Sequence, residues 1–150
     1  MTQEISSKDM KVNKDLVHWT LFDSGLKIAE IARELNKPDS SVRGWFNRKT
    51  KIENMSLKDT ADLTRIAIEK KGISLKSIDY DVKSSLIEWL IKESGISQWI
   101  ISEGSNLPRT TIHRLSTGER SVEKLTLRSA EQLSKYAANQ LNKRKDLLEQ

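Results

Sequence analysis

The chain contains two copies of one sequence pattern. A shift of 70 residues aligns 16–68 with 86–138 without a gap. The identical pairs in this alignment are Leu16/Leu86, Trp19/Trp89, Ser24/Ser94, Gly25/Gly95, Ile31/Ile101, Asn36/Asn106, Pro38/Pro108, Glu53/Glu123, Leu57/Leu127, Leu63/Leu133 and Ala67/Ala137. Chance does not readily place tryptophan, a Ser-Gly pair, asparagine and proline at one offset. We therefore infer a duplicated small domain, because this period is longer than that of a solenoid repeat.

Each copy is predicted to be helical. The chain has only six glycines and two prolines, and its β-branched residues do not alternate with polar residues over any long run. The predicted helices cover about 14–24, 27–35 and 38–48 in the first copy, and about 83–94, 97–104 and 108–116 in the second. A fourth helix begins near Ser56 and stops by Gly72. Its counterpart begins near Glu123 or Lys124 and continues to about residue 147, so the fold class is all-α with a long C-terminal helix.

Local signals mark the ends of these helices. Gly25 and Gly95 end the first helix of each copy, as a left-handed C-terminal cap requires. Asn36 or Asn106 occupies a tight turn between the second and third helices, where asparagine tolerates positive φ. A proline then starts each third helix. The expected organisation is a first domain over 1–71, a linker over 72–82 and a second domain over 83–150.

Two short helices joined by a tight turn form a helix-turn-helix, whose second helix lies in the DNA major groove. On the third helices, Val42 and Trp45, or Ile112 and Leu115, are three residues apart and are predicted to face the core. The opposite face of the second copy carries side chains that can hydrogen-bond to base edges: Arg109, Thr110, Thr111, His113 and Arg114. The corresponding base-contacting candidates in the first copy are Ser40, Ser41 and Arg43.

A second group of residues is predicted to contact DNA phosphates. In the first copy the third helix runs into a basic cluster, "NRKTK", and such side chains suit phosphates more than bases. The predicted phosphate contacts are Gln98, Lys27, Asn47, Arg48, Lys49, Lys51 and Arg120. The net charge of +5 and the pI near 9.4 are compatible with an anionic partner.

Residues 86–137 resemble the phage-repressor and Cro type of helix-turn-helix domain, the Xre family. The matching pieces are "SGISQ", "LPRTTIHRLSTGE" and "LTLRSAEQLSKY". The resemblance implies a small all-helical domain that binds operator DNA, commonly as a dimer. It also implies a phosphate contact by Gln98 and base contacts by Arg109, Thr110 and Arg114. The first copy looks like a more diverged member, with Ile28, Asp39, Ser40 and Gly44 at these four positions.

Aromatic and apolar residues outside this motif suggest packing roles. Trp19 and Trp89 share one position of the repeat and are predicted to lie in the core, whereas Phe46 is predicted to lie at an interface. Trp99 either packs on the other copy or forms an exposed contact. An apolar stripe on the C-terminal helix either folds back across both copies or pairs with a second chain. We expect a homodimer through this stripe, which contains Leu133, Tyr136 or Ala137, Leu141 and Leu148.

The composition argues against several classes of protein. There is no cysteine, and the two histidines, His18 and His113, lie in unlike parts of the repeat, so a metal site is not expected. No nucleophile elbow, phosphate loop or paired-carboxylate motif is present, so neither catalysis nor a cofactor is expected. The polar first residues and the lack of a long apolar run favour a cytoplasmic protein without a membrane span.

The sequence therefore predicts two tandem four-helix helix-turn-helix units in a sequence-specific regulator that binds double-stranded DNA. A transcriptional repressor of phage, plasmid or bacterial origin fits this pattern best. The alternative is a protein-binding inhibitor on a repressor-like fold, such as an anti-CRISPR-type phage protein that also regulates its own gene. A plasmid replication or partition adaptor is a third possibility that the sequence does not separate from the first.

Overall fold

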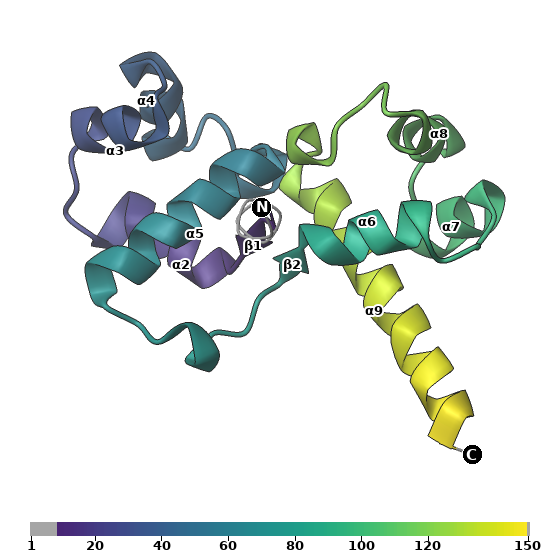
Figure 1. Cartoon of the computed structure of the whole chain (residues 1–150). Coiled ribbons are helices and arrows are strands. Elements are labelled where there is room, and N and C mark those ends of the chain that lie inside the picture. Colours follow the sequence, from purple (N-terminus) through teal and green to yellow (C-terminus); the bar gives the residue numbers. More distant parts are fainter. Residues whose placement is uncertain (1–8, 150) are drawn as a thin grey trace, which may run out of the picture.

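A computed structural model describes residues 9–149 of the chain and shows an all-α fold built from two helical units (Figure 1). Unit one, residues 9–71, contains β1 (Lys11–Val12), α2 (Lys14–His18), a π-helical continuation (Trp19–Asp23), α3 (Ile28–Leu35), α4 (Asp39–Phe46), a 3-10 turn (Ile52–Asn54) and α5 (Leu57–Lys71). Unit two, residues 83–149, contains α6 (Ser84–Lys92), α7 (Gln98–Ser105), α8 (Arg109–Thr117), a 3-10 turn (Val122–Lys124) and α9 (Leu127–Glu149). The segment that joins them contains a 3-10 turn (Leu75–Ser77) and leads into β2 (Val82–Lys83), which ends at the first residue of unit two.

The turns between the paired short helices form as predicted. Asn36 and Asn106 adopt left-handed backbone conformations, with φ of 55° and 60°, and end α3 and α7. Ser97 caps α7, since its side chain accepts a hydrogen bond from the N–H of Ile100. These caps bring α4 back across α3, and α8 back across α7, in two helix-turn-helix motifs.

The inward faces of the third helices are also as predicted. Val42 and Ile112 are fully buried, and Trp45 and Leu115 are only 6% and 4% exposed. The long C-terminal helix is present, but it begins at Leu127, because residues 122–124 form a separate 3-10 turn that precedes it.

The prediction that the two repeated tryptophans lie in the core is only partly right. Trp19 and Trp89 are half-buried, and each ring is covered by a basic side chain from the last helix of its unit. The ammonium of Lys71 lies 4.9 Å from the ring centre of Trp19, and the guanidinium of Arg144 lies 4.9 Å from that of Trp89. Arg144 also donates a 2.6 Å hydrogen bond to the carbonyl of Ser94, which ties α9 to the end of α6.

Equivalent residues of the repeat meet where the two units touch. β1 and β2 pair in antiparallel register with Val12 opposite Val82, which are 70 positions apart. A second antiparallel bridge joins Ser56 to Thr126, again 70 positions apart. An antiparallel pairing of equivalent residues places both contacts on one approximate two-fold axis.

The backbone hydrogen bonds at this contact obey the same symmetry. The N–H of Leu57 donates to the carbonyl of Leu125 at 2.7 Å, and the N–H of Leu127 donates to the carbonyl of Met55 at 2.8 Å. The two bonds are equivalent under the repeat, because Leu57 corresponds to Leu127 and Leu125 corresponds to Met55. All four side chains are buried in one hydrophobic cluster that runs through both units. The two units therefore form a single body with approximate two-fold symmetry.

One ion pair across the contact between the units breaks this symmetry. Lys14 Nζ on α2 lies 2.9 Å from Glu131 Oε2 on α9, whereas the equivalent positions hold Ser84 and Ala61. The hydrogen bond to Glu131 raises the pKa of Lys14, although burial opposes it. Burial raises the pKa of Glu131, but hydrogen bonds from Lys14 and Lys135 outweigh it and lower that pKa below its ordinary value of 4.5.

Glu131→Gln is therefore expected to lower the free energy of unfolding at neutral pH by about 0.5–1 kcal/mol, a small loss because the pair is partly exposed. A carboxylate with a lowered pKa stabilises the fold above its unfolded pKa, and this stabilisation is lost as the pH falls through the folded value. Denaturant unfolding of both proteins along an acid series should thus show the difference closing below pH 4.5. A constant difference across the series would contradict this account.

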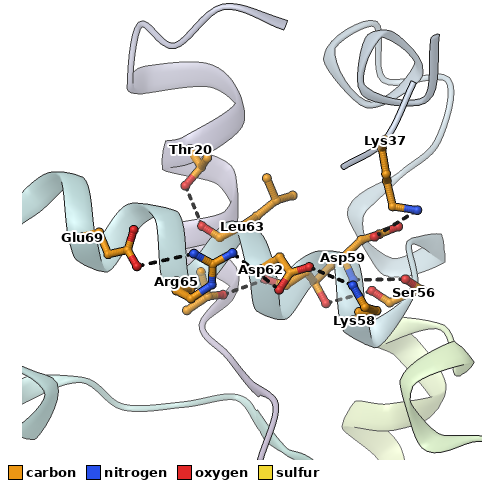
Figure 2. Close-up of polar contacts among 11 residues, drawn as sticks. Thr20, Lys37, Ser56, Lys58, Asp59, Asp62, Leu63, Arg65 and Glu69 are labelled. Atoms are coloured by element: carbon orange, nitrogen blue, oxygen red, sulfur yellow. Dashed lines mark hydrogen bonds and ion pairs between the residues drawn. The ribbon is translucent and has the colours of Figure 1, made fainter. Parts of the chain in front are cut away.

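The outer face of α5 carries a chain of alternating charges (Figure 2). Asp62 pairs with Lys58 and Arg65, and Arg65 pairs in turn with Glu69. These acids and bases offset one another, so this face is a solvated surface with little net attraction for phosphates. Nearby, Lys37 of the unit-one turn lies 3.3 Å from the buried carboxylate of Asp59 and ties the turn to α5.

Candidate nucleic-acid interface

The outer face of α8 is polar and open to solvent. Arg109, Thr110, His113 and Arg114 are exposed, and Thr111 is half-buried. The opposite side of the helix is held in the core by Ile112 and Leu115, as described above. All five candidate base-contacting side chains of unit two therefore lie on one short helix, and four of them are free to approach a groove.

A hydrogen-bonded group holds the start of α7 against α8. Gln98 donates from Nε2 to Ser116 Oγ at 3.0 Å, and its Oε1 lies 3.3 Å from His113 Nδ1. Ser116 in turn donates to the carbonyl of His113 at 2.6 Å. These bonds restrain the side chains of Gln98 and His113, so neither has to be ordered entirely at the moment of binding.

Ser116 is a member of this group that the sequence does not predict as a site residue, because its contact with Gln98 depends on the packing of α7 against α8. The positions of Gln98, His113 and Ser116 change together in the first copy, where they hold Ile28, Arg43 and Phe46. The polar group is thus specific to unit two.

Arg114 has one partner within the chain. Its Nε lies 3.3 Å from Glu119 Oε2, and the two side chains are 51% and 65% exposed. A pair this open to solvent contributes about 0–1 kcal/mol. Arg114 can therefore exchange this carboxylate for a base edge at small cost.

The equivalent face of α4 in unit one is weaker in hydrogen-bond donors. Ser40 and Arg43 are exposed, and Ser41 is half-buried. Asp39 and Gly44 occupy the positions that are equivalent to Arg109 and Arg114 of unit two. Gly44 has nothing closer than 4.0 Å to its would-be Cβ, so the missing side chain leaves open space.

Aromatic residues replace the polar group at the end of α4. The ring of Phe46 is half-buried, 6.5 Å from that of Phe22, so the two pack within unit one. The guanidinium of Arg48 lies over Phe22 at 4.3 Å from the ring centre. Arg48 also has a positive φ of 58°, and the equivalent residue of unit two, Gly118, has a positive φ as well.

The remaining residues predicted to contact phosphates differ in their solvent exposure. Asn47, Lys49 and Lys51 are exposed beside Arg48, and Lys27 is exposed at the start of α3. Arg120 is half-buried, and its Nε is covered without a hydrogen-bond partner among the described residues. The basic cluster is therefore accessible in unit one, whereas Arg120 presents only part of its side chain.

Comparisons with protein-family models, curated proteins and solved structures return no match for this chain. Across residues 9–149, none of the helices has the length and apolar character needed to span a bilayer. The same part of the chain holds no group of three or more His, Cys, Asp or Glu side chains arranged to bind a metal ion.

Proposed function

We propose that this protein is a sequence-specific regulator of transcription that binds double-stranded DNA through α8. The observation that carries the proposal is the exposed row of Arg109, Thr110, His113 and Arg114 on a helix whose other side is buried. The resemblance of residues 86–137 to Xre-type repressor domains supports repression as the outcome.

Each part of the motif has a chemical role in this proposal. A guanidinium can donate two hydrogen bonds to the O6 and N7 atoms of guanine, so Arg109 and Arg114 would contact base edges. Thr110 and His113 can donate to or accept from neighbouring bases. Gln98, restrained at the N-terminus of α7, would meet the phosphate backbone and set the depth of α8 in the groove.

An electrophoretic shift at two salt concentrations tests the proposal. The probe is duplex DNA from upstream of the protein's own gene, and the competitor is a shuffled duplex of the same length and composition. We expect the upstream probe to be retained at both salt concentrations and to resist the competitor. Equal displacement by both duplexes, with binding lost at moderate salt, would refute sequence-specific recognition.

The basic cluster of unit one is predicted to act through phosphates alone. Arg48→Ala with Lys49→Ala should weaken binding to all sequences alike and lower the slope of log affinity against log salt by up to about 2. Titration by fluorescence anisotropy at several salt concentrations measures this slope. Lys58→Ala with Arg65→Ala, on the charge-paired face of α5, is the control with the same change in charge, and an equal loss of slope there would contradict the assignment.

Association of two chains through the end of α9 is a further part of the proposal. Leu133 and Ala137 are buried in the core of unit two, but Leu147 and Leu148 are 69% and 88% exposed. Leu147→Lys with Leu148→Lys is expected to halve the mass that light scattering measures for the free protein. Identical masses for both proteins would contradict dimerisation through this helix end.

A protein-binding inhibitor is the second candidate, and one observation favours it. Trp99 and Ile100 are neighbours on α7 and are 56% and 48% exposed. Trp99 does not pack on the other unit, so an exposed contact is the remaining role for it. Under this alternative, Trp99→Ser with Ile100→Ser would abolish inhibition of a host protein while leaving the electrophoretic shift unchanged.

A further inference from the structure

The approximate two-fold axis of the chain relates its two helix-turn-helix motifs. Residues at the axis pair with their own repeat equivalents, as Val12 does with Val82, and the same shift of 70 carries α4 onto α8. Figure 1 shows α3 with α4 on one flank of the molecule and α7 with α8 on the other, with the contact between the units in the middle. One polypeptide thus has the arrangement that a symmetric dimer of single motifs would have.

Helix-turn-helix dimers bind two inverted half-sites about one helical turn apart, and the symmetry of the operator mirrors that of the protein. We propose that a single chain of this protein, whether free or within a dimer held through α9, occupies both half-sites of one operator, and that these half-sites differ in sequence. This inference rests on the proposed function and names the class of DNA that the protein recognises.

The difference between half-sites follows from the residues on the two outer faces. Arg109 and Arg114 of α8 donate hydrogen bonds, as guanine O6 and N7 require. Asp39 of α4 can only accept, which suits the amino group of cytosine, and Gly44 has no side chain to offer. A perfect palindrome would satisfy one of these faces and leave the other mismatched.

The spacing of the half-sites is set by a rigid connection. The units share one hydrophobic cluster and the exchanged backbone hydrogen bonds at Leu57 and Leu127. The joining segment is anchored as well, because Asp81 accepts a 2.7 Å hydrogen bond from the N–H of Lys14 and the carbonyl of Asp79 accepts one from Asn13. Inserting about 5 bp, half a helical turn, between the half-sites should therefore release one of them.

Hydroxyl-radical footprinting on a duplex selected from random sequence tests this inference. The proteins compared are the full chain, Arg114→Ala on α8 and Arg43→Ala on α4. Both residues are exposed, so the substitutions leave the core intact. We expect the wild type to protect two adjacent half-sites of unlike sequence. Arg114→Ala should lose protection over one of them and Arg43→Ala over the other.

The possible failures separate the two proposals. Equal loss over both halves of a palindromic site with Arg114→Ala would mean that two chains each use α8, which overturns the single-chain inference but leaves DNA binding intact. Protection of one half-site alone by the wild type also overturns the inference. If selection from random sequence enriches no site, the proposed function itself fails.

Discussion

Arg114→Ala is expected to weaken binding to the preferred operator by about 1–3 kcal/mol, or roughly 5- to 150-fold in Kd. The reason is geometric: Arg114 is exposed on the outer face of α8, whereas Ile112 and Leu115 of the same helix are buried in the core. A guanidinium there can donate bidentate hydrogen bonds to guanine, which alanine cannot form. The loss should also be selective, because the variant should tolerate at that base pair a substitution that the wild type rejects.

Fluorescence anisotropy with the operator and with each single-base-pair variant of it measures both effects. Arg65→Ala is a matched control, because it removes the same charge from the ion-paired face of α5. We expect the control to retain the affinity and the full pattern of base preferences. Unchanged affinity and preference in Arg114→Ala would mean that the outer face of α8 is not a base-contacting surface.

Leu127→Ala is expected to lower the free energy of unfolding by about 2–5 kcal/mol, the usual cost of a cavity at a fully buried leucine. Leu127 begins α9 at the two-fold axis, and its N–H donates to Met55 of the other unit. Because one hydrophobic cluster spans both units, the loss should be felt in the whole chain.

Native-state hydrogen exchange measures where the stability is lost. We expect protection to fall together in α5 of unit one and α9 of unit two, and denaturant unfolding to show a single transition. Leu75→Ala makes the same chemical change at a position that is 67% exposed and should leave stability nearly unchanged. Loss of protection confined to unit two would show that the units fold separately.

Much of the fold was predictable because its signals are local. Glycine and asparagine at helix ends and proline at helix starts act over a few residues. The same signals occur at equivalent positions of both copies, which strengthens each prediction. The inward-facing Val42, Trp45, Ile112 and Leu115 followed from helical spacing alone. The predicted start of α9 is three to four residues too early, since residues 122–124 form a 3-10 turn and Leu125 then has an extended backbone before the helix begins.

The features that the sequence did not reveal depend on contacts between distant residues. Arg144 contacts the ring of Trp89 across about 55 positions, whereas the recurrence of tryptophan at that position of the repeat predicts a place in the core. The antiparallel bridge between Ser56 and Thr126 likewise has no local sequence signal, because it is formed by backbone groups and not by particular side chains.

The candidate site divides in the same way. The open polar face of α8 followed from helical spacing and residue chemistry, whereas the bonds that join Gln98 to Ser116 and His113 required the packing of α7 on α8. The charge of Arg48 predicts a phosphate contact, whereas the position of its guanidinium over the ring of Phe22 depends on the packing within unit one.

Site-specific disulfide cross-linking tests the insertion of α8 into the major groove, and the absence of cysteine from the chain is an advantage for this experiment. Thr110→Cys places one thiol on the exposed face of α8, and a thiol tethered to a base in the major groove of the selected operator provides its partner. Arg65→Cys on α5 is the control. We expect Thr110→Cys to cross-link at a single base position and Arg65→Cys to give no product. No cross-link from Thr110→Cys at any position, with the protein bound to the duplex, would contradict the insertion of α8 into the major groove.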